Sequence, residues 1–211
     1  RTPETLARIV STGRFLPPRV VTNDDLAEIV DTSDEWIRTR TGIRERRIGV
    51  DDMGASHMAA EASSQALARA GVAPEEVDVL IVTTATPDRW LPATACETQA
   101  LLGCDNAMAF DLMAACTGFL YALTMAEGYL NAGRGETALV VSTEKMSSIV
   151  DWTDRTTCVL VGDGAGAAVV KRSEGDGRGI LSAHLRSDGK LADLLQRPAG
   201  GAAVPLTQEL L

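Results

Sequence analysis

Cys116 is the side chain whose type and position most directly suggest covalent chemistry. It lies in the run Asp111-Leu-Met-Ala-Ala-Cys-Thr-Gly-Phe-Leu-Tyr121, where an apolar strand is expected to end and a helix to begin. Small neighbours leave the thiol accessible, and the positive end of a helix dipole lowers a thiol's pKa and makes it a nucleophile. Free cysteines are also often buried in Ala-rich cores. On position alone, a nucleophilic and a structural Cys116 remain equally open.

A cluster of arginines indicates a possible site for an anionic ligand. The cluster falls within ten residues and comprises Arg38, Arg40, Arg44, Arg46 and Arg47. The whole chain carries a net charge of −9, which argues against nucleic acid as a partner, although a local basic patch can override the global sign. The alternative is a solvated segment whose arginines form ion pairs with nearby acids.

Other candidate chemistry is sparse. Besides Cys116 the sequence has Cys96, Cys104 and Cys158, with no CxxC pair, and its two histidines are His57 and His184. These spacings do not match a metal-ligand pattern, so neither a metal nor a resident cofactor is expected, and both histidines are expected to be solvated or in the core. No signal peptide or apolar run of ~20 residues is recognisable. We therefore expect a cytoplasmic protein with reduced thiols and no membrane partner.

Strands and helices are expected to alternate over most of the 211 residues. Apolar runs and helical spacing predict strands at 5–12 (ended by Gly13), 77–84, 107–111 and 137–143, and helices at 23–30 (with Asn23 as N-cap), 54–70 (closed by Gly71), 93–103 and 117–132. The strand at 77–84 is apolar almost throughout, which is typical of the centre of a sheet covered on both faces.

After residue 150 the pattern changes to closely spaced strands. Residues 156–161 and 165–171 are predicted to form two strands joined by a tight turn at 162–164, and residues 178–187 a further strand. The glycine run 162–167 is not followed by a helical pattern, so we do not expect it to bind a nucleotide phosphate; its glycines are expected to permit a turn and close backbone approach. Together these patterns predict an α/β protein with a mixed sheet covered by helices on both faces.

Several segments resemble one family. Asp31-Thr-Ser-Asp-Glu-Trp-Ile-Arg-Thr-Arg-Thr-Gly-Ile-Arg-Glu-Arg46 closely resembles the signature of β-ketoacyl-acyl-carrier-protein synthase III, and Ala114-Ala-Cys-Thr-Gly-Phe119 resembles its nucleophile segment. Thr153-Asp-Arg155 and the glycine run resemble its later blocks, in the expected order. The resemblance extends from about residue 9 to about residue 195. It implies the thiolase-like fold, with a five-stranded-type mixed sheet in each half of a duplicated architecture.

The resemblance implies an acyltransferase that condenses an acyl-CoA primer with malonyl-acyl-carrier protein, with loss of carbon dioxide, to start fatty-acid synthesis. Acetyl-CoA is the default primer. Cys116 would be the acylated residue, because exchange between thioesters keeps the acyl group activated, and its backbone N–H would contribute to an oxyanion hole. Thr32, Trp36, Arg40 and Arg155 match positions that hold coenzyme A. The alternatives are an ordinary packed indole for Trp36 and a surface ion pair for Arg155.

The resemblance also bears on assembly. It places Leu91, in Trp90-Leu-Pro92, where the family has a residue that crosses the interface of a homodimer into the partner's acyl pocket, so its size would help to set primer length. Ordinary interface packing is an equally open role for Leu91.

The second half of the duplicated fold is absent from the given sequence. We expect residues 1–195 to form the N-terminal thiolase-like domain, with the coenzyme A segment and the cysteine, and residues 196–211 to form a loop toward the absent half. The family's condensing His and Asn would lie in that half. The expected explanation is that the sequence is part of a longer protein; a split enzyme and a non-condensing half subunit are the alternatives. A ketosynthase or acyltransferase that primes polyketide or secondary-metabolite synthesis is the alternative function.

Overall fold

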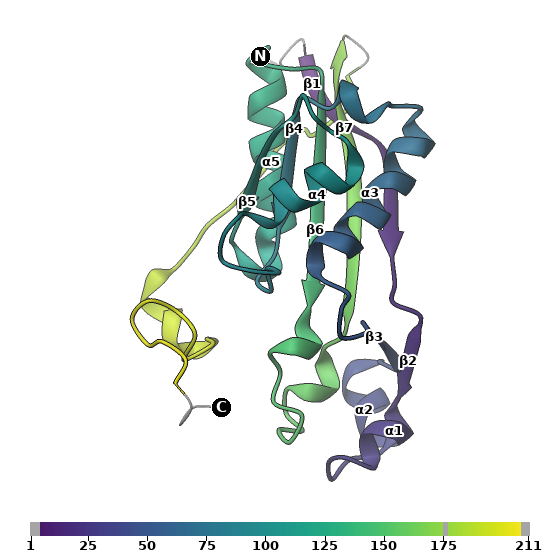
Figure 1. Cartoon of the computed structure of the whole chain (residues 1–211), viewed down its shortest axis with the longest axis vertical. Coiled ribbons are helices and arrows are strands. Elements are labelled where there is room, and N and C mark those ends of the chain that lie inside the picture. Colours follow the sequence, from purple (N-terminus) through teal and green to yellow (C-terminus); the bar gives the residue numbers. More distant parts are fainter. Residues whose placement is uncertain (1–4, 175–176, 208–211) are drawn as a thin grey trace.

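One mixed five-stranded sheet forms the frame of the molecule (Figure 1). The computed structural model describes residues 5–174 and 177–207. The strands are β1 (Thr5–Phe15), β4 (Val79–Thr83), β5 (Met108–Leu112), β6 (Thr137–Lys145) and β7 (Asp163–Glu174), in the spatial order β1-β7-β6-β4-β5. Strands β5, β4 and β6 run parallel, whereas β7 is antiparallel to both β6 and β1. The predicted mixed sheet is confirmed.

Helices cover both faces of this sheet, as predicted. Helices α3 (Ala55–Ala70) and α4 (Thr94–Leu102) pack on one face, and α5 (Gly118–Asn131) packs on the other. Strand β4 shows the division most clearly, because Leu80 and Val82 belong to the core under α3 while Val79 and Ile81 belong to the core under α5. Every residue of β4 is buried, which explains its continuous apolar sequence.

A smaller unit lies beyond the carboxyl ends of the parallel strands (Figure 1). It contains the antiparallel pair β2 (Arg19–Thr22) and β3 (Glu45–Ile48) together with the short helices α1 (Asn23–Ala27) and α2 (Asp34–Thr41). A separate apolar cluster that includes Leu26, Ile37 and Val159 holds it together. Strands β2 and β3 are not predicted by the sequence pattern, because β3 is mostly charged and each strand is four residues long.

The N-cap of α1 is Thr22, so the assignment of Asn23 to that position is wrong. The Thr22 hydroxyl accepts a hydrogen bond from Asp25 N–H, and the Asp25 carboxylate accepts one from Thr22 N–H, which forms a capping box. The Thr22 hydroxyl also donates to the Asp25 carboxylate at 2.7 Å, and this bond, together with the one from Thr22 N–H, lowers the pKa of Asp25. Asn23 is instead buried inside the smaller unit, where its amide donates to Asp34 and to the Ile43 carbonyl.

Strand β1 does not end at Gly13 but continues to Phe15. Gly13 pairs with Ala167 of β7 and lies directly against α3. A Cβ atom at this position would collide with the Ala62 carbonyl oxygen and would lie 2.7 Å from Ala66 N. Gly13 therefore permits close contact between β1 and α3 and does not terminate the strand.

Two predicted strands are absent from the described residues. Residues 156–161 form turns and a short 3₁₀ helix, Cys158–Leu160, so they make no hairpin with β7, whose two neighbours are already β1 and β6. Residues 178–187 form no strand, because most of their side chains are exposed and no surface covers an alternating apolar face. Ile180 N–H donates to the Ala7 carbonyl, and the chain then leaves the sheet toward the 3₁₀ segment Gly189–Leu194 (Figure 1).

The remaining predicted elements are confirmed, and most of their ends agree within two residues. The exceptions are α1, which ends at Ala27 and not at residue 30, and β7, which continues to Glu174 and not to residue 171. Gly71 closes helix α3 as predicted, with a φ of 63°.

Residues 163–167 of the glycine run already belong to β7, so the predicted tight turn at 162–164 is wrong. No helix follows the glycines, which agrees with the rejection of a nucleotide loop. Gly162 also makes the expected close approach, since a Cβ there would lie 3.0 Å from Arg46 Cβ and 3.3 Å from the Arg47 carbonyl oxygen.

Candidate active site

Cys116 lies at the turn between β5 and α5 and is exposed. It is the middle residue of a 3₁₀ turn, Ala115–Thr117, and α5 begins at the next residue, Gly118. The thiol is therefore reachable and stands at the start of a helix, as predicted. The structural alternative of a buried core cysteine is wrong for Cys116 but holds for Cys104 and Cys158. Burial raises the pKa of Cys104 to about 11 and that of Cys158 above its ordinary value.

The backbone before Cys116 is strained. Ala115 has a φ of 44°, and it is the sole non-glycine residue with a positive φ among the described residues. The turn is held from the other side by Thr117, whose hydroxyl donates to the Ala114 carbonyl at 3.0 Å. Such conformations cost about 1–3 kcal/mol and persist where the surrounding structure enforces them. Strain next to an exposed thiol marks this turn as a candidate site.

A second group of predicted residues converges on the Trp36 indole. Trp36 and Arg40 lie on α2, whereas Arg155 lies in the segment between β6 and β7. The Arg40 and Arg155 guanidinium carbons lie 4.4 Å and 4.9 Å from the Trp36 ring centroid. Both distances are within the range of cation–π contacts. The fold thus joins three residues that were singled out from separate parts of the sequence.

Hydrogen bonds hold both elements of this group in place. On the α2 side, Ser33 caps the helix by accepting from Trp36 N–H. On the other side, Asp151 accepts from Thr153 and Asp154 accepts from Thr156 and Thr157, which folds the turns on either side of Arg155. These bonds lower the pKa values of Asp151 and Asp154.

Arg155 also contacts Asp31, which lies in the segment just before α2. Its guanidinium donates to the Asp31 backbone carbonyl and lies 3.5 Å from the Asp31 carboxylate, as part of an ion pair between exposed side chains. The adjacent Thr32 hydroxyl oxygen is buried and has no hydrogen-bond partner in the described part of the chain. Arg155 therefore makes a surface ion pair, as the alternative held, and lies at the indole as well.

The five clustered arginines do not form one patch. Arg46 is only 5% exposed and donates to Asn23 and to the Val21 and Val159 carbonyls, so it supports the smaller unit from inside. Desolvation lowers the pKa of Arg46. Arg38 pairs with Asp34 at 3.1 Å and Arg47 with Glu45 at 3.4 Å. Arg40 is the member of the cluster that lies over Trp36, so the local ion-pair interpretation accounts for part of the cluster.

Leu91 lies at the exposed tip of the loop between β4 and α4, where it is 84% exposed and its neighbour Trp90 is 67% exposed. Carboxylates fix both ends of this loop. Glu144 accepts from Ala85 N–H at 2.8 Å, and both oxygens of Asp111 accept from the first amides of α4, Thr94 and Ala95, at 2.7 Å. The chain therefore presents Leu91 outward on a firmly held loop and not against Cys116 within the same chain.

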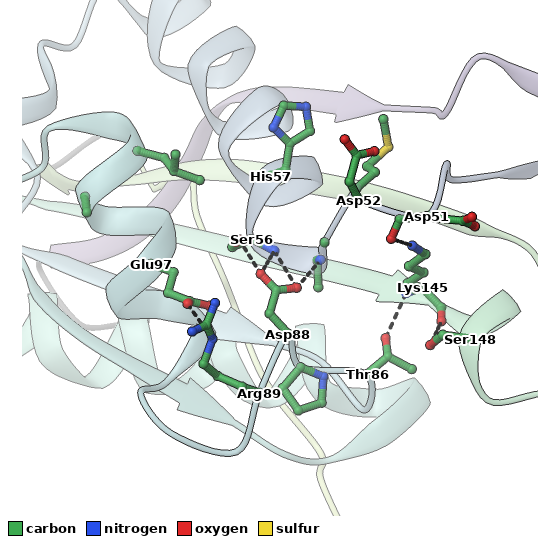
Figure 2. A pocket seen from close by; sticks show the side chains of 16 residues that line it. Asp51, Asp52, Ser56, His57, Thr86, Asp88, Arg89, Glu97, Lys145 and Ser148 are labelled. Atoms are coloured by element: carbon green, nitrogen blue, oxygen red, sulfur yellow. Dashed lines mark hydrogen bonds and ion pairs between the residues drawn. The ribbon is translucent and has the colours of Figure 1, made fainter. Parts of the chain in front are cut away.

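A pocket of about 770 Å³ opens beside this loop, at the start of α3 (Figure 2). Several of its charged groups are engaged within the chain: Asp88 accepts from Ser56, Arg89 pairs with Glu97 at 2.9 Å, and Lys145 donates to the Val50 and Asp51 carbonyls. Cys116 does not line it. We therefore place the candidate site at the Cys116 turn and the Trp36 group and not at this pocket.

Neither histidine belongs to the Cys116 turn or to the Trp36 group. His57 is exposed on α3 and makes an edge contact with Phe15, and His184 is exposed on the segment after β7. Over the described ranges, no group of three or more His, Cys, Asp or Glu side chains is arranged to hold a metal ion. Across the same residues, no helix combines the length and apolarity needed to cross a membrane.

Comparison with known proteins identifies related sequences and structures. The family model described as 3-oxoacyl-[acyl-carrier-protein (ACP)] synthase III matches residues 110–189, which include Cys116 and Arg155. A β-ketoacyl-[acyl-carrier-protein] synthase III from Rhodospirillum centenum is 54% identical over 195 residues, which are 91% of this chain and 60% of the relative. The chain thus spans about three fifths of the length of the curated relatives it matches.

Solved structures place the fold in the same group. The crystal structure of 3-oxoacyl-(acyl carrier protein) synthase III from Pseudomonas aeruginosa PAO1 superimposes with a TM-score of 0.88 at 43% identity, covering 95% of this chain and 62% of that one. The priming β-ketosynthase of the R1128 polyketide pathway gives a TM-score of 0.78 at 43% identity, covering 82% and 52%. With its thiolase-like sheet and its cysteine turn, the chain belongs to the β-ketoacyl-[acyl-carrier-protein] synthase III family.

Proposed function

We propose that this chain carries the acyl-accepting part of an acyltransferase that joins an acyl-CoA primer to malonyl-acyl-carrier protein and so initiates fatty-acid synthesis. The observation that carries the proposal is the pairing of an exposed cysteine at a strained strand-to-helix turn with an indole flanked by two guanidinium groups. The first feature suits a nucleophile, and the second suits an aromatic base with phosphates attached.

In the first step, the Cys116 thiolate attacks the carbonyl carbon of the primer thioester. The new carbon–sulfur bond replaces the bond to the sulfur of coenzyme A, which leaves as a thiolate and takes up a proton. Because one thioester replaces another, the acyl group stays activated. Backbone N–H groups at the start of α5 are placed to stabilise the oxyanion of the tetrahedral intermediate, since the first amides of a helix lack intrahelical acceptors.

In the second step, malonyl-acyl-carrier protein loses carbon dioxide, and the resulting carbanion attacks the acyl carbonyl on Cys116. The cysteine thiolate is released and the new carbon–carbon bond remains on the carrier protein. This step needs groups that stabilise the carbanion. We assign none of them to the described residues, because neither histidine lies at the Cys116 turn.

For coenzyme A, we assign the adenine to the Trp36 group. The Trp36 indole provides a face for stacking, and Arg40 and Arg155 provide fixed positive charge for phosphate oxygens. The buried, unpartnered Thr32 hydroxyl lies next to Asp31, which Arg155 contacts, and supplies an unused hydrogen-bonding group there. In this assignment no resident cofactor is required, since coenzyme A enters as part of the substrate.

Leu91 is assigned to the acyl pocket of a second copy of the chain in a homodimer. The support is its 84% exposure on a loop that Glu144 and Asp111 hold at both ends. A branched aliphatic side chain at this position leaves more room than an aromatic one. Its replacement by Phe is therefore expected to disfavour longer primers relative to acetyl-CoA.

The test of the nucleophile is the intact mass of the chain before and after incubation with acetyl-CoA. Addition of one acetyl group is expected, and this addition should disappear in Cys116→Ser. Cys96→Ser is the matched control, because Cys96 is also exposed and its loss should leave acetylation intact. Acetylation that persists in Cys116→Ser would show that the nucleophile has been assigned wrongly.

A second candidate function is priming of polyketide synthesis. The observation in its favour is that the R1128 priming β-ketosynthase is as similar in sequence, at 43% identity, as the fatty-acid enzyme of Pseudomonas aeruginosa. Both functions use an acyl-cysteine, so labelling of Cys116 does not separate them. Competition between acetyl-CoA and longer acyl-CoA primers for Cys116 does, because preference for acetyl-CoA favours fatty-acid initiation.

A further inference from the structure

The contact between the start of α5 and the end of β4 has no role in the site described so far. Gly118, the first residue of α5, lies directly over the side chain of Thr83, the last residue of β4. A Cβ atom at Gly118 would be 2.5 Å from Thr83 Oγ1 and 2.9 Å from Thr83 Cβ. Both distances are shorter than normal van der Waals contacts, so no larger residue fits there unless the helix moves.

The sheet fixes Thr83 on the face that carries α5. Side chains alternate along a strand, and Val79 and Ile81 already belong to the core beneath α5, so Thr83 points to the same face. It is 2% exposed, and it pairs with Leu112 of β5 on one side and Ser142 of β6 on the other. Its hydroxyl donates to the Ser142 hydroxyl at 3.4 Å. Thr83 is thus a fixed point at the centre of the parallel strands.

The residues of α5 that face the sheet become larger away from this point. The buried positions of the helix are Gly118, Ala122, Ala126 and Leu130, spaced by one helical turn. The smallest of them is at the end that carries Cys116. The helix is therefore set closest to the sheet where the nucleophile stands, and the depth of that end is limited by the Thr83 side chain.

We propose that Thr83 is a positioning residue for Cys116. Its contact with Gly118 sets the distance between the start of α5 and the sheet, and this distance determines the position of the thiol. Cys116 is two residues before Gly118, and the strained Ala115 lies on its other side. A displacement of Gly118 must therefore be taken up in the turn that holds the thiol. The inference rests on the proposed role of Cys116 as nucleophile.

The test is a double-mutant cycle read out by the alkylation rate of Cys116 with iodoacetamide, followed by peptide mass spectrometry. Gly118→Ala is expected to slow alkylation on the order of ten- to a hundredfold, because its new methyl group collides with Thr83. Thr83→Ala in the Gly118→Ala background should recover part of the rate, because it removes Oγ1, the closest atom. Coupling between the two positions separates positioning from a general loss of stability.

Three controls make the result specific. Gly128→Ala changes a glycine of the same helix whose added Cβ would meet no atom within 4 Å, so the Cys116 rate should not change. Cys96, exposed on α4, is an internal reference thiol whose rate should be equal in all variants. Thr83→Ser, which keeps the hydroxyl, should retain the wild-type rate, whereas Thr83→Val should slow alkylation, because a methyl group replaces the oxygen under Gly118.

The Thr83→Ser and Thr83→Val pair keeps the test decisive if Gly118→Ala does not fold, because both are small changes in a buried strand. An unchanged Cys116 rate in Thr83→Val, or a Gly118→Ala defect that Thr83→Ala does not relieve, would overturn the proposal. The readout does not use acyl-CoA, so it is distinct from the test of function. If the cycle shows coupling but acetyl-CoA does not label Cys116, the positioning role stands and the acyltransferase proposal falls.

Discussion

At the scale of single residues, the chain separates a reacting group from a recognition group. Cys116 lies at the turn between β5 and α5, whereas Trp36 and Arg40, on α2 of the smaller unit, form a cluster with Arg155 from the segment between β6 and β7. Such a separation suits a long substrate with its reactive thioester at one end and a charged base at the other. A substitution in the recognition group should then leave the reactivity of Cys116 unchanged, and a substitution of Cys116 should leave ligand binding by the recognition group unchanged.

We predict that Trp36→Ala weakens binding of coenzyme A by about 1–3 kcal/mol, because a base loses its stacking surface. The measurement is isothermal titration of the chain with coenzyme A. Iodoacetamide alkylation of Cys116 in the same variant should be unchanged. The control is Trp90→Ala, which removes a tryptophan that is 67% exposed and outside the cluster. Equal affinity in Trp36→Ala and wild type would remove Trp36 from the recognition group.

At the scale of elements, close contacts at two glycines set how helices sit on the sheet. Gly118 brings α5 against β4 on one face, and Gly13 brings β1 against α3 on the other. In both places the strand and the helix approach until backbone or Cβ atoms touch. The positions of α3 and α5 relative to the five strands therefore depend on the absence of a side chain at one residue in each contact.

We predict that Gly13→Ala lowers the free energy of unfolding by about 1–3 kcal/mol, which is the usual cost of overpacking. The new methyl group would meet the Ala62 carbonyl and Ala66 N, which belong to the helix backbone and yield little. Urea unfolding followed by circular dichroism measures the change. Gly166→Ala, on the adjacent strand β7, is the control, since its added Cβ would meet nothing within 4 Å. Similar stabilities of the two variants would contradict the close-contact explanation.

At the scale of the whole molecule, exposed apolar side chains gather on the outer side of α5 and on the segment before it. Leu120 and Met125 of α5 are 55% and 50% exposed, and Met113, in the segment before the helix, is 58% exposed. Apolar groups that gather on one helix and its approach segment are typical of a surface that another layer of protein covers. The sheet and its two helix layers are therefore expected to associate through this side.

We predict that the 211-residue chain self-associates in solution and that Leu120→Lys with Met125→Lys reduces this association. Light scattering after size-exclusion chromatography gives the molecular mass of each form. Ser64→Lys with Gln65→Lys adds the same charge on the exposed side of α3 and should leave the association unchanged. A wild-type chain that is monomeric at high concentration would show that the exposed side of α5 does not drive assembly.

Elements with strong local signals, and the residue types of the site, could be predicted from the amino-acid sequence. The apolar run of β4, the helical spacing and terminal glycine of α3, and the position of Cys116 between strand and helix all depend on neighbours along the chain, and all were confirmed. The resemblance to the family also singled out Trp36 and Arg40 in one segment and Arg155 in another.

The contacts between distant segments became known from the three-dimensional fold alone. Residues 156–161 form turns and a 3₁₀ helix and not the expected hairpin strand, because β1 and β6 already pair with β7. The fold also buries Arg46 among carbonyls, brings Arg155 onto Trp36, and places Gly118 against Thr83. These outcomes depend on pairing and packing between residues far apart in the sequence. Local propensity carries no information about such contacts, because their energies arise only when the sheet has formed.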